Sequence, residues 1–323
     1  MEFCFIISQI VTLSNILIIK HGSLGDLIQA NGAINDIKNN FPTEKILLLT
    51  TPPYADFMYS CPYLDGVLID KRLPRWNIFY LYKLKKMIDR FNFTKVFDLQ
   101  NSSRTRFYKK FFFKKDIFWS DSRSFSSKEK ILQEINLPVL ERMGHQLERA
   151  GIKEIKFTKK PNLKWSIKNI SNIINQNFDG KYILIFPFCS PKLVKKKWPY
   201  FKDLIKIIKR DYGNKYNIAV APGPNEIDEA KNLKIDIILN KGNALNISEL
   251  ISFIDNASYI ISNDTGPAHI CAHLNKKGLV LFGSHTTPEK VSIESENFKP
   301  IKVNDLKDLN VSDVYEKVRQ ELN

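Results

Sequence analysis

Three features that assign many proteins to a class are missing from this sequence. No window approaches the roughly 18 uninterrupted apolar residues of a membrane-spanning helix. The four cysteines have neither the spacing of a metal site nor that of a disulfide framework, which favours a reducing cytoplasm. The fingerprint Gly-x-Gly-x-x-Gly and the Gly-Lys-Ser/Thr phosphate loop are also absent, which argues against a simple dehydrogenase or NTPase.

The N-terminal segment 1–14 is apolar but lacks the basic start and the small-residue cleavage site of a signal peptide. It is also too short and too interrupted to cross a membrane. We therefore expect it to be a loosely attached extension of the first domain.

The charge is unusual, with 49 Lys and Arg against 34 Asp and Glu and a net charge of +15. Residues 1–160 hold 26 of the basic residues and 16 of the acidic ones. This excess suggests that the first half meets an acidic partner: a phosphorylated substrate, an anionic membrane surface or nucleic acid. A solvated surface in a Lys-rich chain explains it as well.

A chain of 323 residues suits two domains of roughly 150 residues each. Short Ile/Leu/Val-rich runs alternate with helical patterns, which predicts parallel sheets covered on both faces. Strands are expected at 15–20, 46–49, 67–69, 95–99, 182–186, 216–221, 236–239, 257–261 and 278–282. We predict two doubly wound domains, 1–160 and 161–323, with a cleft between facing strand ends. The terminal helix, 311–322, is expected to pack back on the first domain.

The stretch Ser262–His269 lies between a predicted strand and a predicted helix. Asp264 or Thr265 is placed to cap the helix, and Pro267 suits its first turn. Free backbone N–H groups and the helix dipole make such a turn an anion site, here for a phosphate or diphosphate. Thr265 would supply a hydroxyl group to the ligand, and Gly266 would allow the ligand to approach the backbone closely. His269 lies one helical turn further along. An ordinary capped helix explains the same residues equally well.

Asp26 lies where the first strand passes into a helix, beside two glycines. A carboxylate at the mouth of the sheet can accept a proton from a substrate hydroxyl. The alternative is that Asp26 is only the N-cap of the helix.

In the second half, Ser190 and the lysines 192 and 195–197 follow a strand, where they could neutralise a diphosphate or simply be solvated. Glu226 follows the next strand and could bind ribose hydroxyls. His269 and His273 have the i, i+4 spacing of a zinc helix, but Ile270 stands where the metalloprotease pattern needs Glu and no third ligand is evident. We predict no metal site.

The segment 102–130 alternates basic and aromatic residues, among them Arg104 and Arg106. Such a pattern fits a nucleic-acid or membrane-surface patch. It also fits a helix that buries its Phe face and solvates its Lys face, and we favour this second interpretation.

Taken together, four blocks resemble glycosyltransferase family 9, the ADP-heptose:lipopolysaccharide heptosyltransferases. They are Ile16–Asp26, Val96–Gln100, Lys196–Pro199 and the run from Asp264–His269 to Gly283. The resemblance implies a GT-B fold, with the acceptor bound by the first domain and the nucleotide-sugar by the second. It implies that Asp26 is the general base, that Lys196, Thr265 and Gly266 stabilise departing ADP, and that Glu226 contacts ribose. The full donor set is then Ser190, Lys196, Glu226, Asp264, Thr265, Gly266 and His269, and the acceptor set is Ser23, Gln100, Arg104 and Arg106.

The function that this resemblance predicts is an inverting transfer of heptose or a related sugar from an ADP-sugar to a lipopolysaccharide or related surface-glycan acceptor. Such a reaction needs one base and fixed positive potential, and no cofactor or obligatory metal. We expect a monomer that acts on a phosphorylated glycolipid at the inner face of the cytoplasmic membrane, without nucleic acid. Two alternatives remain: another nucleotide-sugar enzyme of this fold, such as a UDP-sugar transferase or epimerase, and a non-catalytic module that binds lipid headgroups or nucleic acid.

Overall fold

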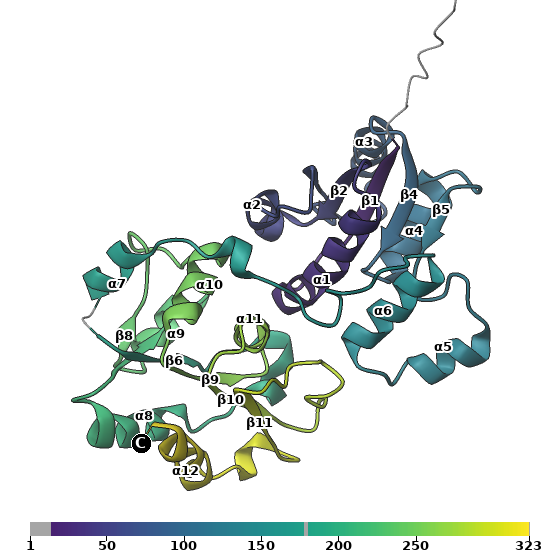
Figure 1. Ribbon diagram of the computed structural model, residues 1–323. Helices are drawn as coiled ribbons and strands as arrows, with labels where there is room; N and C mark the ends of the chain where they lie inside the picture. The colour runs from purple at the N-terminus through teal and green to yellow at the C-terminus, as the bar shows by residue number, and fades with distance from the viewer. Residues whose placement is uncertain (1–13, 178–179, 323) are drawn as a thin grey trace, which may run out of the picture.

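The structure is a computed structural model that describes residues 14–177 and 180–322. The chain forms two α/β halves, each with its own parallel sheet (Figure 1). The predicted N-terminal extension lies, except for Ser14, outside the described residues. None of the helices in those two ranges combines the length and apolar character needed to cross a bilayer.

The first sheet has five strands in the order β3-β2-β1-β4-β5. They are β1 (Asn15–Ile19), β2 (Lys45–Thr50), β3 (Gly66–Ile69), β4 (Phe93–Asp98) and β5 (Phe118–Ser120). The helices of this half are α1 (Leu24–Asn40), α2 (Pro52–Tyr59), α3 (Ile78–Asp89), α4 (Ser103–Phe112), α5 (Lys128–Glu134) and α6 (Val139–Arg149). All neighbouring strands are parallel, as the apolar runs predict.

The second sheet has six strands in the order β11-β10-β9-β6-β7-β8. They are β6 (Tyr182–Phe186), β7 (Asn217–Val220), β8 (Asp236–Ile237), β9 (Tyr259–Asn263), β10 (Gly278–Phe282) and β11 (Phe298–Lys302). The helices are α7 (Ser171–Asn177), α8 (Phe201–Tyr212), α9 (Ile227–Lys231), α10 (Ile247–Asn256), α11 (Gly266–His273) and α12 (Val311–Leu322).

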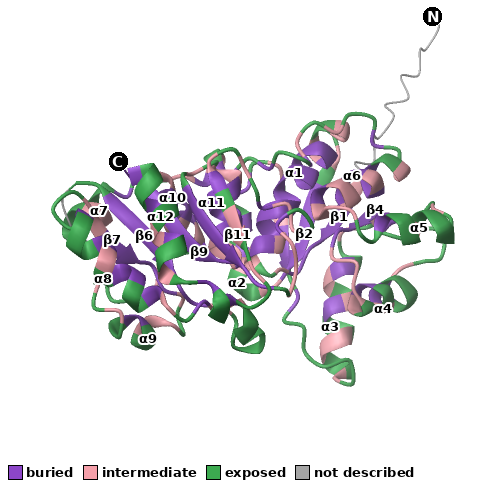
Figure 2. Ribbon diagram, turned by 90° about the horizontal axis from the view of Figure 1, so that it is seen from below, coloured by how far each residue is buried: buried purple, intermediate pink, exposed green. Residues whose placement is uncertain are grey.

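Alternate residues of the central strands face opposite helix layers. In β1, Ile16 and Ile18 join the core that contains α1, whereas Leu17 and Ile19 join the core of α3 and α4. This two-sided burial, visible as buried strands inside partly exposed helices in Figure 2, explains why the strands are apolar without alternation. The strand order reverses between β1 and β4 in one sheet and between β6 and β9 in the other. Ligands of doubly wound folds bind at such reversals, beyond the carboxyl ends of the strands.

Two features of the second half differ from the sequence prediction. The terminal helix α12 packs against α8 within the second half, and not on the first domain. Its buried residues Val314 and Val318 cover the face of the second sheet that carries Ile183 and Tyr259. The strand β11 was not predicted, because Phe298–Lys302 alternates charge with a proline and lacks a long apolar run.

Candidate active site

A cavity of about 850 Å³ lies between the two halves, at the carboxyl edges of both sheets. From the first half it is lined by Ser23 and Leu24 at the start of α1, and by Tyr54 and Phe57 of α2. From the second half it is lined by Phe188, Ser190, Glu226, Thr265 and Gly266, with the neighbouring loops. A cavity of this size can hold a nucleotide-sized ligand.

The turn from β9 into α11 forms one wall of the cavity. Thr265 is the N-cap residue with extended backbone, and Pro267 lies in the first turn. Asn263 fixes the turn, because its side chain donates to the Pro187 carbonyl at 2.7 Å and accepts from the Trp198 N–H at 3.1 Å. The first N–H groups of α11, which have no partner within the helix, therefore begin at the cavity wall.

Asp264 is buried behind this wall, with 2% of its surface exposed. Its Oδ2 accepts hydrogen bonds from Lys196 Nζ at 2.6 Å and lies 2.9 Å from His285 Nε2. Burial raises the pKa of Asp264, but the His285 hydrogen bond and the Lys196 charge lower it more, and the net pKa is below the usual value. An ionised Asp264 therefore holds Lys196 beside the N-terminus of α11.

The neighbouring Lys197 has a different environment. Its Nζ pairs with Glu229 and lies 6.0 Å above the centre of the Phe188 ring. Of the two adjacent lysines, Lys196 is therefore the one that meets the Asp264 turn.

The start of α1 forms the opposite wall through Ser23, which is the N-cap, and Leu24, and Asp26 follows as the third residue of the helix. Asp26 is therefore not the N-cap itself, but its carboxylate completes a capping box with Ser23. Asp26 Oδ2 accepts from the Ser23 N–H at 2.9 Å and from its hydroxyl at 3.0 Å, and Lys20 Nζ lies 3.9 Å from Oδ1. Burial opposes the charged form, but Lys20 and the Ser23 hydrogen bonds outweigh it, so the pKa of Asp26 lies below its usual value.

The N-terminal turns of α1 and α11 pack directly against each other. A Cβ atom on Gly25 would lie 2.4 Å from Cδ2 of His269, and one on Gly266 would lie 3.0 Å from the Leu24 Cβ. Glycine at both positions therefore allows the close approach. His269 is buried between the helices, and burial lowers its pKa despite the charges of Asp264 and Asp26.

Comparison with protein families covers part of these residues, including Lys196 and the Asp264 turn but not Asp26. The model of glycosyltransferase family 9 (heptosyltransferase) matches residues 81–316. The chain belongs to glycosyltransferase family 9. It is a transferase of the GT-B-like class of fold, with two parallel sheets.

Solved structures support the fold. The chain is similar to E. coli heptosyltransferase WaaC with ADP, with a TM-score of 0.69 and 16% identity over 95% of this chain and 99% of that one. E. coli ADP-heptose lps heptosyltransferase II gives a TM-score of 0.71 and 15% identity over 95% and 98%. A UDP-GlcNAc 2-epimerase from Methanocaldococcus jannaschii gives 0.58 and 16% identity over 96% and 93%. Sequence comparison with curated proteins gives no significant match.

Glu226 and Ser190 of this family 9 enzyme line the cavity from the second half. Glu226 accepts a hydrogen bond from the Gly223 N–H at 2.8 Å, which directs its carboxylate along the loop after β7. Burial raises the pKa of Glu226. The predicted donor set is thus divided: Ser190, Glu226, Thr265 and Gly266 line the cavity, and Lys196, Asp264 and His269 support it from behind.

The predicted acceptor set is also divided. Ser23 lies on the cavity wall, and Gln100 accepts from the His21 N–H at 2.8 Å at the end of β4. Arg106 is exposed on α4. Arg104, in contrast, donates to the Leu73 carbonyl at 2.9 Å and lies 3.4 Å from the buried carboxylate of Asp70. Its guanidinium is therefore held by the loop after β3 and does not point to an acceptor as a free cation would.

The helix α4 confirms in part the interpretation favoured for the basic-aromatic segment. Tyr108 and Phe112 are buried on the sheet, while Lys109 and Lys110 are exposed. Phe111 is 55% exposed, so the aromatic residues are not all on the buried face.

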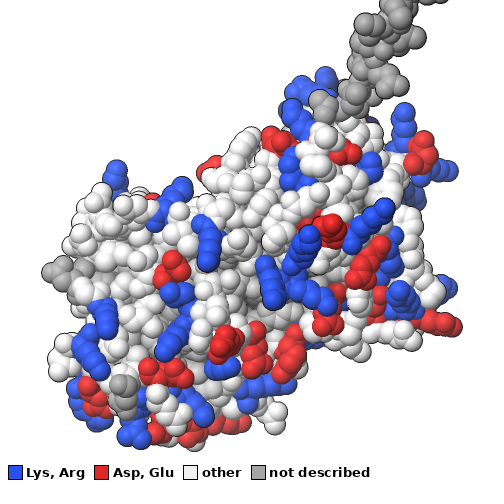
Figure 3. Space-filling view, in the orientation of Figure 1, with Lys and Arg blue, Asp and Glu red and all other residues white. Residues whose placement is uncertain are grey.

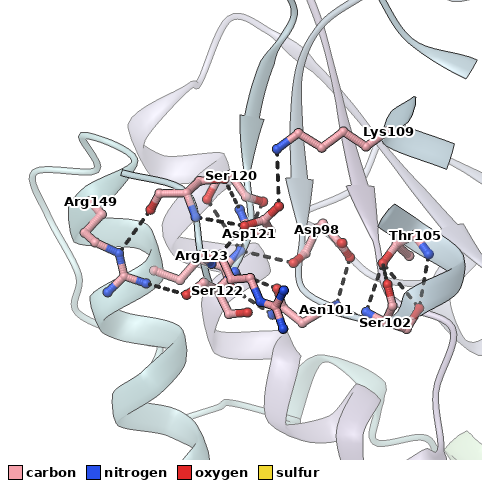
Figure 4. Close-up of polar contacts among 12 residues, drawn as sticks. Asp98, Asn101, Ser102, Thr105, Lys109, Ser120, Asp121, Ser122, Arg123 and Arg149 are labelled. Atoms are coloured by element: carbon pink, nitrogen blue, oxygen red, sulfur yellow. Dashed lines mark hydrogen bonds and ion pairs between the residues drawn. The ribbon is translucent and has the colours of Figure 1, made fainter. Parts of the chain in front are cut away.

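A polar network joins the ends of β4 and β5 (Figure 4). Oδ1 of Asp98 accepts from the N–H groups of Gln100 at 3.1 Å and Asn101 at 3.0 Å. The Asn101 side chain in turn donates to Gln146 of α6 at 3.0 Å and accepts from the Ser122 N–H. Burial raises the pKa of Asp98 to about 6, against the hydrogen bonds that favour its charge.

Several residues of the site were not predicted, because they come from distant parts of the chain. His285 contacts Asp264 from the loop after β10, a position that the rule of polar residues at strand ends could have flagged. Arg142 of α6 has a buried Nε without a hydrogen-bond partner among the described residues, and its charge lowers the pKa of Lys20, after the larger effect of burial. No sequence pattern marks Arg142. Within the described ranges, no three His, Cys, Asp or Glu side chains are grouped to hold a metal ion.

Proposed function

We propose that this enzyme transfers heptose, or a related sugar, from an ADP-sugar to a lipopolysaccharide-core or related surface-glycan acceptor, with inversion at the sugar. One observation carries the proposal: the N-terminal turns of α1 and α11 pack together beside one cavity. The Asp26 carboxylate, two residues after the cavity-lining Leu24, therefore lies close to the anion-binding end of α11, where its charge acts on His269. A base opposite a site for the leaving diphosphate is the arrangement that an inverting transfer needs.

The second half would bind the donor. The diphosphate would accept hydrogen bonds from the first N–H groups of α11 and from the hydroxyl of Thr265, with Gly266 allowing close contact. Lys196, held by Asp264, would neutralise charge on the leaving ADP, and Glu226 would bind the ribose hydroxyls. The choice of ADP is supported by the solved relatives, since E. coli WaaC binds ADP and ADP-2-deoxy-2-fluoro heptose in its structures.

The first half would bind a phosphorylated glycolipid at the inner face of the cytoplasmic membrane, and the enzyme would act there as a monomer. Ser23 and Gln100 lie at the reversal between β1 and β4, where such an acceptor would enter. The unpartnered Nε of Arg142, beside Lys20, would meet an acidic group of the acceptor.

In the reaction, an acceptor hydroxyl would attack the anomeric carbon of the donor sugar. The new C–O bond would form as the bond to the β-phosphate oxygen breaks, and the hydroxyl proton would pass to Asp26. The lowered pKa keeps Asp26 ionised near neutral pH, ready to accept a proton as the hydroxyl becomes acidic in the transition state. The α11 N-terminus would stabilise the charge that develops on ADP.

The substitution Asp26→Asn tests this function. It should lower kcat by about 10²–10⁴, because a positioned base is lost, and leave the Kd for ADP unchanged. Asp228→Asn, whose side chain is 93% exposed on α9, is the control and should behave as wild type. Asp56 is an aspartate that lines the cavity from the first half, so loss of turnover in Asp56→Asn but not in Asp26→Asn would assign the base to Asp56.

The identity of the nucleotide is tested separately. ADP at 100 times its Kd should add about 2.7 kcal/mol to the free energy of unfolding, and UDP should add much less. Stronger stabilisation by UDP than by ADP would favour a UDP-sugar transferase or epimerase.

A further inference from the structure

Four large apolar side chains are exposed together on the first half, away from the cavity. Trp76 is 80% exposed, Ile78 75%, Phe79 84% and Tyr82 64%. They lie in the loop after β3 and in the first turns of α3, and we refer to these four residues as the Trp76 face. Single exposed apolar residues are ordinary, but four within seven positions indicate an interaction surface.

The charge around the Trp76 face has one sign. From Lys71 to Ile88 the sequence contains six basic residues and no acidic one; the basic residues are Lys71, Arg72, Arg75, Lys83, Lys85 and Lys86. Lys85 pairs with Asp89 at 2.6 Å, just beyond this segment. Tryptophan and tyrosine favour the boundary between water and lipid, and lysine and arginine are attracted to anionic headgroups. An anionic bilayer therefore complements both properties of the face.

A buried network holds the loop and α3 so that these rings point outward. The carboxylate of Asp70, at the end of β3, accepts from the Arg72 N–H at 2.7 Å, from the Tyr108 hydroxyl at 2.6 Å and from Tyr80. Arg104 closes the loop by donating to the Leu73 carbonyl. The apolar rings cannot turn into the core, because the opposite side of α3 already packs on the sheet through Leu84 and Ile88.

The position of the face suits a membrane-bound substrate. The loop 71–77 follows the carboxyl end of β3, the same sheet edge at which Asp26 lies. In Figure 2, α3 and α4 lie together at the lower edge of the first half, whereas α5 lies at the right and the second half at the left. The described chain begins at the other end of α3, where the Asn15 side chain donates to the Phe91 carbonyl.

We propose that the Trp76 face docks on the surface of an anionic phospholipid bilayer. Trp76, Ile78, Phe79 and Tyr82 insert at the headgroup boundary, and the surrounding lysines and arginines contact the anionic headgroups. The purpose of this docking rests on the proposed function, because it would hold the cavity mouth near a lipid-linked acceptor. The docking itself requires neither donor nor acceptor.

The test is co-sedimentation of the full chain with phosphatidylcholine vesicles, with and without phosphatidylglycerol. The wild-type chain should bind the anionic vesicles, and added salt should weaken this binding. Trp76→Ala/Phe79→Ala should lower the partition coefficient by about tenfold or more, because two rings no longer leave water. The matched control Leu132→Ala/Ile135→Ala removes two side chains, on α5 and at its C-cap, that are 67% and 55% exposed, and should bind as wild type.

The charge component is measured with Lys83→Gln/Lys86→Gln. This variant should lose most of the preference for phosphatidylglycerol, whereas Lys206→Gln/Lys231→Gln on the second half should retain it. Thermal unfolding and the Kd for ADP should be unchanged in every variant. If the wild type did not bind ADP at all, this result would contradict the proposed function but not the docking of the Trp76 face on the bilayer.

Three results would overturn the proposal. They are failure of the wild type to bind anionic vesicles, equal binding by wild type and Trp76→Ala/Phe79→Ala, and equal losses in that variant and the α5 control. Binding of an oligouridylate through Trp76 and Phe79, with no binding of vesicles, would identify the face as a nucleic-acid surface instead.

Discussion

Asp98 is a buried carboxylate whose charged form is disfavoured. Its Oδ1 accepts two backbone hydrogen bonds, but its Oδ2 has no partner among the described residues, and Asp121 adds a like charge nearby. Burial is the largest effect and raises the pKa to about 6, from 3.8 in an unperturbed Asp. In the folded state Asp98 therefore binds a proton between pH 3.8 and about 6, where the unfolded chain has already lost it.

This shift predicts a pH dependence of stability. The folded state binds more protons than the unfolded state in that window, so the Asp98 contribution to the free energy of unfolding falls as the pH rises through it. The charged form of Asp98 thus destabilises the fold by an amount that is zero below the unfolded pKa and reaches its full value above about pH 6. That full value is on the order of 3 kcal/mol. Asp98→Asn, which keeps the Oδ1 acceptor, should be more stable than wild type at pH 8 and lose this advantage towards pH 4.

Urea unfolding at several pH values measures the difference between the two proteins. Asp228→Asn, a change at a solvent-exposed carboxylate, should show no such gain at pH 8. An Asp98→Asn variant that is less stable than wild type at pH 8 would mean that the charged form is needed, for instance by the nearby Lys20.

Lys196 gives a second prediction at the residue scale. Because Asp264 holds its Nζ at 2.6 Å beside the α11 N-terminus, Lys196→Ala should weaken ADP binding by about tenfold to a hundredfold. AMP, which lacks the β-phosphate, should be affected far less. Calorimetry with both nucleotides measures this, and Lys197→Ala is the control, since Lys197 pairs with Glu229. Equal losses for ADP and AMP would place Lys196 away from the diphosphate.

At the scale of elements, the packing contact between α1 and α11 holds the two halves together beside the cavity. Both helices begin immediately after the strands next to the reversals, and both bring a glycine to the contact, Gly25 and Gly266. The sequence places each glycine at a strand-to-helix turn, but it does not reveal that the two turns touch. That contact depends on how the two sheets are placed, which no local pattern encodes.

Gly25→Ala tests the packing contact between α1 and α11. Helix propensity alone would stabilise α1 by up to about 1 kcal/mol, but the new Cβ would lie 2.4 Å from the His269 ring, and such overpacking costs about 1–3 kcal/mol. We expect a lower free energy of unfolding and a lower kcat. Gly144→Ala on α6 is the matched control, because its Cβ would meet nothing within 4 Å and should be neutral or stabilising.

A double-mutant cycle identifies the cause of the Gly25 effect. Removing the ring in Gly25→Ala/His269→Ala should recover stability relative to the sum of the single changes, with a coupling of about 1 kcal/mol or more. Additive effects would show that the loss does not arise from the contact with His269.

For the whole molecule, the sequence predicted the parts better than their assembly. Apolar runs and turn residues located the doubly wound halves, and the resemblance of the Asp264 and Asp26 blocks predicted the family. The pairing of Lys196 with Asp264, the contact of His285 with Asp264 and the contact of Arg104 with Asp70 join segments up to 68 residues apart in the chain. Periodicity reports which face of an element is buried, and it does not report which distant side chain meets it. The position of α12 was mispredicted for the same reason.

The overall charge of +15 leads to the last prediction. Basic side chains are spread over both halves and interspersed with acidic ones (Figure 3), so an acceptor would be attracted by local groups more than by a uniform field. On α4, Arg106 and Lys110 are exposed, whereas Arg104 is occupied by Asp70 and Leu73. Arg106→Gln/Lys110→Gln should therefore raise the KM for a phosphorylated acceptor and flatten its dependence on salt, with the KM for the donor unchanged.

The size of this effect follows from the number of charges removed. Each exposed basic residue near an anionic surface contributes about 1 kcal/mol at moderate salt, so two should change the acceptor KM by roughly tenfold or somewhat more. Lys206→Gln/Lys231→Gln, with the same loss of charge on the second half, should leave the acceptor KM unchanged. Arg104→Gln should instead lower the thermal stability, because it releases the loop after β3 and leaves Asp70 with one cation fewer. Unchanged acceptor kinetics in Arg106→Gln/Lys110→Gln would make α4 an ordinary solvated helix and leave attraction of the acceptor to Arg142 and Lys20.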